Sequence, residues 1–152
     1  MVVDTAVYTV HTAFAALWAG SVLFVVVAVQ PLAMEGDIAP AAYGRIVSTL
    51  RRVTRASALL LFLSGGYMAA TGYTVESLTG SSTGHLVLTM LGLWLALAAT
   101  VEAGSARALR GIEQRKIREP AREARPFLRA AAVVAVALLI VAGLLGRPPA
   151  GL

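Results

Sequence analysis

Four long apolar segments dominate this sequence and decide what the chain can fold into. They are Thr5–Val29, Ala56–Tyr73, Gly84–Val101 and Phe127–Leu145. Crossing the hydrocarbon core of a bilayer takes roughly 20 residues of helix, and each segment is close to that length or longer. Little of the 152 residues is left for a soluble domain. We therefore predict one domain over residues 1–152, an all-α membrane protein built as an up-down bundle of four transmembrane helices with spans near 5–30, 53–73, 84–105 and 127–146.

The composition agrees with a chain that spans the lipid bilayer. Hydrophobic residues make up 58% of the chain and charged residues only 14%, whereas a soluble domain carries about 25% charged residues. The chain has no cysteine, which excludes disulfides, thiolate metal sites and covalent haem attachment through Cys-x-x-Cys-His. The first segment carries Asp4 and no basic residue at its start, and its apolar run exceeds the ~7–15 residues of a signal peptide. We expect it to remain in the mature protein.

The distribution of basic residues predicts how the bundle is oriented. Of the thirteen Lys and Arg, four flank the first connection and eight lie between the third and fourth segments. Short loops rich in Lys and Arg stay on the cytoplasmic side of the plasma membrane. We therefore expect loops one and three to be cytoplasmic and both termini to lie outside. The net charge of +5 then serves orientation and contact with anionic lipid, and it does not indicate nucleic-acid binding.

Prolines suggest where the helices end. The first helix is predicted to end at Gln30–Pro31, because proline does not continue a helix cleanly. A second helix is expected over Ile38–Gly72, about 50 Å long at ~1.5 Å per residue, with a basic amphipathic half outside the hydrocarbon. Pro120 and Pro126 are expected to interrupt the chain before the fourth helix begins.

Two patterns predict how the helices pack together. Small residues spaced four apart allow close approach of helices, within the bundle or across a homodimer. These pairs are Ala16 and Gly20, Gly65 and Ala69, Gly66 and Ala70, and Thr100 and Gly104. Glu102 is the one acid clearly inside a span, and Arg55 reaches a similar depth on the antiparallel second helix. We predict a salt bridge between Glu102 and Arg55.

The only two histidines, His11 and His85, fall near the same predicted outer face. A histidine inside a bilayer needs a polar partner and is a functional candidate for that reason. Facing imidazoles on two helices of a bundle commonly hold a haem iron. His11, Ala15 and Trp18 share one helical stripe, where a small side chain leaves room for a flat ligand. We predict a haem b site with His11 and His85 as ligands and Ala15 and Trp18 beside the ring. The alternative for each histidine is a helix-end ring bonded to a backbone carbonyl.

Met68 adds a second kind of ligand at a depth similar to that of the histidines. A thioether can ligate copper or iron, although methionine is also an ordinary filler of packed helices. His11, His85 and Met68 together would form a copper site in a transport or handling permease. A third hypothesis is a cofactor-free assembly or anchoring subunit. Motifs for hydrolysis or phosphoryl transfer do not occur in the sequence.

The run His11-Thr-Ala-Phe-Ala-Ala-Leu-Trp18-Ala-Gly20-Ser21, followed by an apolar helix ending in Gln30-Pro31, resembles the first helix of the CopD copper-resistance membrane family. In that family a histidine is followed, after six or seven residues, by Trp-x-Gly. The run is also similar to HemJ-type membrane proteins, which are linked to haem binding and protoporphyrinogen oxidation. The resemblance implies that His11 is a haem or metal ligand.

The third helix departs from the HemJ-type pattern. Those proteins carry a functional lysine there, whereas this chain has none and begins the helix with His85. This departure argues against protoporphyrinogen oxidation and favours a bis-histidine haem. We therefore expect an electron-transfer or haem-dependent oxidoreductase role with an unidentified redox partner. Its alternative is copper handling as in the CopD family.

Overall fold

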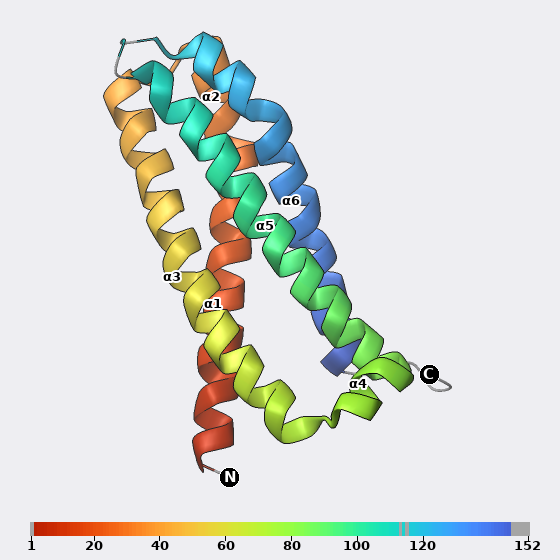
Figure 1. Ribbon diagram of the computed structural model, residues 1–152. Coiled ribbons are helices and arrows are strands. Elements are labelled where there is room, and N and C mark those ends of the chain that lie inside the picture. Colours follow the sequence, from red (N-terminus) through yellow and green to blue (C-terminus); the bar gives the residue numbers. More distant parts are fainter. Residues whose placement is uncertain (1, 113, 115, 147–152) are drawn as a thin grey trace.

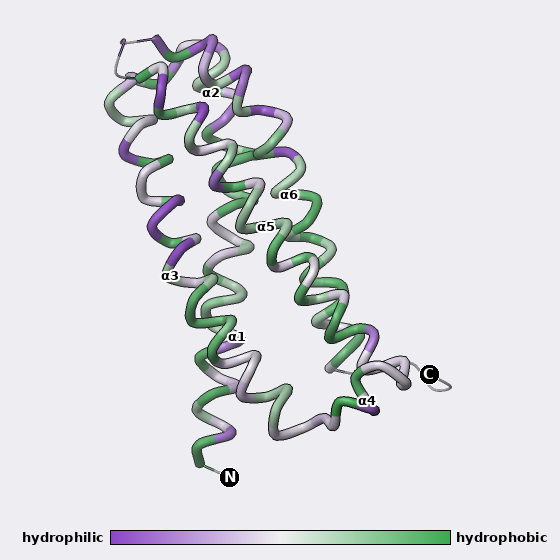
Figure 2. Tube along the Cα trace, in the orientation of Figure 1, coloured by the Kyte–Doolittle hydropathy of each residue, from purple (hydrophilic) through white to green (hydrophobic). Residues whose placement is uncertain are grey.

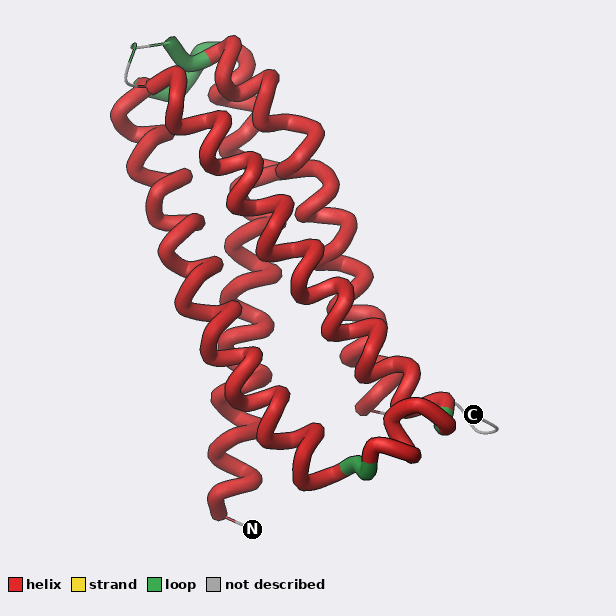
Figure 3. Tube along the Cα trace, viewed as in Figure 1, coloured by secondary structure: helices red, strands yellow, loops and turns green. Residues whose placement is uncertain are grey.

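The computed structural model describes residues 2–112, 114 and 116–146, and helices make up nearly all of this part of the chain (Figure 3). Four long helical rods run up and down in a bundle (Figure 1). The elements are α1 (Val2–Phe24), the π-helical turn η1 (Val25–Val29), α2 (Gln30–Glu35), α3 (Pro40–Gly72), the short α4 (Val75–Gly80), α5 (Ser82–Ile112) and α6 (Arg118–Gly146). All four rods are long and apolar enough to cross a membrane. The predicted fold class is confirmed.

The two ends of the bundle differ in polarity. Hydrophilic residues gather where α2, the start of α3, the end of α5 and the start of α6 meet (Figure 2); we call this the basic end. The opposite end, where α1 begins and α4 lies, is called the α4 end. Because consecutive rods are antiparallel, both basic connections lie at the same end of the molecule.

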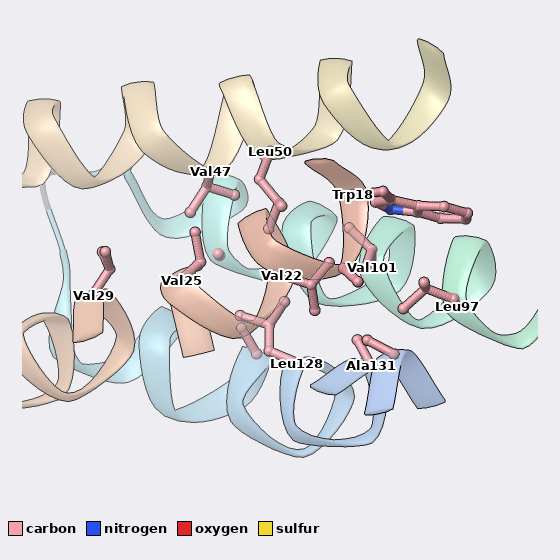
Figure 4. Close-up of a cluster of buried hydrophobic side chains, with 14 of the residues drawn as sticks. Trp18, Val22, Val25, Val29, Val47, Leu50, Leu97, Val101, Leu128 and Ala131 are labelled. Atoms are coloured by element: carbon pink, nitrogen blue, oxygen red, sulfur yellow. The ribbon is translucent and has the colours of Figure 1, made fainter. Parts of the chain in front are cut away.

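The core follows a repeat of 3.5 residues. Apart from Gly44, the buried positions on α3 alternate between steps of four and three: Tyr43, Val47, Leu50, Thr54, Ser57, Leu61 and Ser64. This spacing is typical of helices that coil around one another with a left-handed twist. Between the rods lie buried apolar side chains (Figure 4), among them Trp18, Val22, Leu97, Val101 and Leu128. Gly104 lets α5 approach α6, because a Cβ there would lie 2.9 Å from Cδ2 of Leu128.

The first rod continues past Pro31, so the prediction that it ends at Gln30–Pro31 is wrong. In η1 the helix widens, and the Gln30 N–H bonds to the carbonyl of Val25, five residues earlier. A wider turn relieves the clash between a proline ring and the carbonyl four residues back. Pro31 then stands in the first turn of α2, where its missing N–H costs nothing. The rod ends at Gly36, which has a left-handed φ of 85°.

The fourth rod begins at Arg118, so the prediction that Pro120 and Pro126 interrupt the chain before it is wrong. Pro120 lies in the first turn of α6, where backbone N–H groups have no helical partner. Its ring packs over Gly111, where a Cβ would overlap it. Pro126 lies inside α6 on an exposed position, and it leaves the carbonyl of Arg122 without its helical donor.

Buried polar groups fix the basic end. The Tyr43 hydroxyl donates to Gln30 Oε1 at 2.7 Å, and Gln30 Nε2 donates to the carbonyl of Ala121 at 2.6 Å. Tyr43, Gln30 and Ala121 are all buried. This chain of two hydrogen bonds joins α3, α2 and α6.

We predict that Tyr43→Phe lowers the stability of the protein by about 1–3 kcal/mol, because it leaves a buried amide oxygen without a donor. Thermal unfolding in detergent measures the change. Tyr8→Phe is the control, since Tyr8 is 61% exposed. Equal melting temperatures for the two variants would contradict the role given to the Tyr43 hydroxyl.

We also predict that Gly84→Ala disturbs the packing of α4 on α5. A Cβ at the buried Gly84 would overlap the carbonyl oxygens of Ser77 and Leu78, and such overpacking costs about 1–3 kcal/mol. Gly92→Ala, on the same helix with no atom within 4 Å of the added Cβ, should not destabilise the protein. Thermal unfolding compares the two variants, and a loss in Gly92→Ala as large as in Gly84→Ala would refute the prediction.

Candidate metal centre

Antiparallel packing of α1 on α3 brings the first candidate ligand to a polar partner. Asp4, His11 and Trp18 are spaced seven residues apart, so they lie on one stripe of α1. Each reaches a polar group on α3, in reverse order along that helix. The three contacts are Tyr67 Oη to Asp4 Oδ1 at 3.3 Å, His11 Nδ1 to Ser64 Oγ at 2.8 Å, and Trp18 Nε1 to Thr54 Oγ1 at 3.0 Å.

The partner of His11 determines which ring nitrogen carries the proton. Ser64 Oγ lies 2.6 Å from the carbonyl of Leu60, and because a carbonyl only accepts, the serine proton points there. Ser64 must then accept the hydrogen bond from His11, so Nδ1 carries the N–H. In a neutral ring this leaves a lone pair on Nε2. No partner of Nε2 is recorded among the described residues, so this nitrogen is available to a ligand.

Two further residues of α3, Gly65 and Met68, lie on the part of the helix next to the half-buried imidazole of His11. A Cβ on Gly65 would lie 3.2 Å from Cε1 of His11, so the glycine lets the ring lie close against α3. Met68 follows Ser64 by one helical turn, is half-buried, and lies on the same side of α3. Metal-binding histidines usually donate their other ring N–H to a fixed acceptor, as His11 does to Ser64. The ring could therefore hold a metal ion through Nε2.

His85 has a different environment. Its side chain is exposed, and Nε2 lies 2.8 Å from the carbonyl of Thr79, so Nε2 carries the proton. This contact ties the start of α5 to α4 and matches the alternative of a helix-end ring bonded to a backbone carbonyl. The structure records no contact between His11 and His85. Across the described ranges, no group of three or more His, Asp or Glu side chains is placed to hold a metal ion.

Trp18 and Ala15, predicted to line a haem, belong to the packing of the bundle. Trp18 is 1% exposed and its indole N–H is bonded to Thr54. Ala15 is half-buried and packs against the same core. The buried indole fills the α1 stripe two turns beyond His11.

The predicted salt bridge between Arg55 and Glu102 is confirmed, and Arg51 joins it as a second partner of the carboxylate. Arg55 Nε lies 2.6 Å from Glu102 Oε1, and Arg51 Nε lies 2.6 Å from Oε2. Arg51 precedes Arg55 by four residues and shares its face of α3. This spacing in the sequence could have predicted Arg51 as a second partner of Glu102. Ser64 lies nine residues further along α3, about 13 Å at ~1.5 Å per residue. The ion-pair cluster is therefore separate from His11.

Four antiparallel apolar rods define an integral membrane protein. A family model described as copper resistance protein D matches residues 44–145, more than half of the chain. The chain belongs to this family, which confirms the predicted CopD resemblance. The match begins in α3, so α1 and His11 lie outside it. No curated protein and no solved structure matched the chain.

Proposed function

We propose that this protein handles copper ions in the membrane, with His11 Nε2 as the principal ligand and the Met68 thioether as the second. The observation that carries the proposal is the pair of hydrogen bonds from His11 to Ser64 and from Ser64 to Leu60. They leave a lone pair on Nε2 of an imidazole that lies close against Gly65 of α3. Imidazole and thioether are both ligands that copper accepts, and thioether favours Cu(I).

The small number of ligands suits an ion that must leave again. Conduction through a membrane protein requires binding that is favourable enough for entry and weak enough for release. One imidazole and one thioether, with no cysteine in the chain, make a site of that kind. We therefore treat copper as cargo in transport or resistance and not as a resident cofactor.

The orientation predicted from the basic residues completes the proposal. If the basic end is cytoplasmic, as expected for short loops rich in arginine, His11 lies toward the outer side of the membrane. A copper ion arriving from outside would then meet the His11 nitrogen early in its passage.

The haem b hypothesis has less support. It requires His85 to release the Thr79 carbonyl and reach α1, and it requires a flat space where Trp18 is buried. A visible spectrum of the purified protein decides this point. A Soret band that sharpens on reduction would favour haem and overturn the copper proposal; a colourless protein would favour copper or a cofactor-free assembly subunit.

We predict that His11→Ala lowers copper accumulation by cells that produce the protein by at least about tenfold, because the principal ligand is lost. His85→Ala is the matched control and should leave accumulation unchanged. Elemental analysis of washed cells gives the result, with gel filtration to show that each variant is folded. Unchanged copper accumulation in His11→Ala would contradict the copper proposal and favour the cofactor-free assembly subunit.

Ser64→Ala tests how His11 is oriented. Without Ser64 the ring loses the acceptor that keeps the proton on Nδ1, and loss of such a supporting hydrogen bond typically weakens metal binding by about 10–100-fold. Competition of the purified protein with a chromophoric Cu(I) chelator measures the affinity.

Ser48→Ala provides the control for that experiment. Ser48 also lies on α3 and also donates to a carbonyl four residues back, that of Gly44, at 2.7 Å. It has no contact with His11 in the structure, so its removal should leave the affinity unchanged. Equal affinities of the two serine variants would argue against the role given to Ser64.

A further inference from the structure

Three arginines form one exposed face at the basic end of α6. Arg122, Arg125 and Arg129 are all exposed, and steps of three and four residues place them on the same side of a helix. They extend over about 10 Å of the helix axis at ~1.5 Å per residue. We call this surface the α6 arginine face.

The same side of α6 continues into the apolar part of the rod. Val133, Val136 and Ile140 follow at helical spacing and are 69%, 43% and 59% exposed. On a membrane-spanning helix these side chains face acyl chains, so the arginines next to them lie where hydrocarbon meets headgroups. Since α6 starts at the basic end, its Cα–Cβ bonds tilt toward that end. The guanidinium groups therefore lean out of the hydrocarbon and toward the headgroups.

Several other cations near the basic end have contacts within the protein, whereas none is recorded in the described part of the chain for the exposed Arg45 and Arg52 on α3. Arg51 and Arg55 bind Glu102, and Arg107 lies 3.7 Å from the centre of the Phe127 ring. Lys116 lies 3.5 Å from Glu119, and the guanidinium of Arg118 packs over Gly36.

For the three members of the α6 arginine face, no hydrogen bond, ion pair or ring contact is recorded within the described ranges. Glu123 follows Arg122 directly, but consecutive residues are about 100° apart around a helix. Its carboxylate therefore belongs to another side of α6. Glu119, three residues before Arg122, lies 3.5 Å from Lys116 and is not recorded as a partner of Arg122. The face therefore keeps positive charge without a recorded ion-pair partner at the edge of the bilayer.

We propose that the α6 arginine face binds the headgroup of an anionic phospholipid in the leaflet at the basic end. A phosphate accepts paired hydrogen bonds from guanidinium groups. Pro126 lies on the same side and leaves the carbonyl of Arg122 without its helical donor. A headgroup that carries hydroxyl groups beside its phosphate, such as phosphatidylglycerol, can donate to that oxygen. Continuity with Val133 and Val136 favours a lipid over an acidic protein, since the acyl chains already lie on this side of α6.

The proposal does not depend on copper handling, and lipid retention tests it directly. The protein is reconstituted in vesicles of phosphatidylglycerol and phosphatidylcholine, extracted in mild detergent, and analysed by native mass spectrometry for bound lipid. We expect the wild-type protein to retain phosphatidylglycerol in preference to phosphatidylcholine. Each arginine near an anionic surface contributes about fivefold in binding, so R122Q/R125Q/R129Q should weaken retention on the order of 100-fold.

R110Q/K116Q/R118Q is the matched control, because it removes the same charge at the same end from outside the α6 arginine face. Arg110 donates to the carbonyl of Ala106, Lys116 lies 3.5 Å from Glu119, and Arg118 packs over Gly36. It should retain phosphatidylglycerol as the wild type does. Equal retention by R122Q/R125Q/R129Q and the wild type would overturn the proposal, as would an equal loss in the control. If the triple variant does not fold, Arg125→Gln alone should show a loss of about fivefold, and no loss would overturn the proposal in the same way.

Discussion

Hydrocarbon neither donates nor accepts hydrogen bonds, and most of this structure depends on that constraint. Each backbone N–H and C=O within a bilayer must be satisfied inside the protein, which leaves helices as the solution for a chain with apolar runs of this length. Most of the polar side chains that the helices carry inward follow the same constraint, although no hydrogen-bond partner is recorded for the buried hydroxyls of Ser57 and Ser105. Gln30, Tyr43, Thr54 and Ser64 each meet a partner on the chain.

These polar side chains also set how the rods align. On α1 the residues that face α3 recur every seven positions, and each bonds to a group on α3 in antiparallel order. A shift of one residue between the two helices would move Trp18 away from Thr54 and His11 away from Ser64, and it would leave the buried indole N–H unpaired. In a membrane, where apolar packing alone gives little directional preference, such bonds specify the register. The position of His11 against Ser64 follows from that alignment.

The sequence predicted much of the fold because hydropathy and charge act over whole segments. Four apolar runs and two clusters of arginine were enough to predict the four rods and the basic end. The sequence predicted the behaviour of single residues, such as prolines and glycines, less well. Pro31 and Pro126 were predicted to break helices, but a π-helical turn and an exposed position accommodate them. Of the small residues predicted to pack, Gly65 and Gly104 lie against neighbours, whereas a Cβ on Gly20 or Gly66 would meet nothing within 4 Å.

By itself the sequence determined that the chain spans a membrane with four helices, and it identified His11, His85 and Met68 as the possible metal ligands. It also predicted the pairing of Arg55 with Glu102, since a lone acid at that depth requires a nearby cation. Only the tertiary structure separated the two histidines, because the proton on an imidazole is placed by what each nitrogen touches. Ser64 leaves Nε2 of His11 free, while the Thr79 carbonyl engages Nε2 of His85. Those partners lie 53 and 6 residues away in the chain, and only folding brings them into contact.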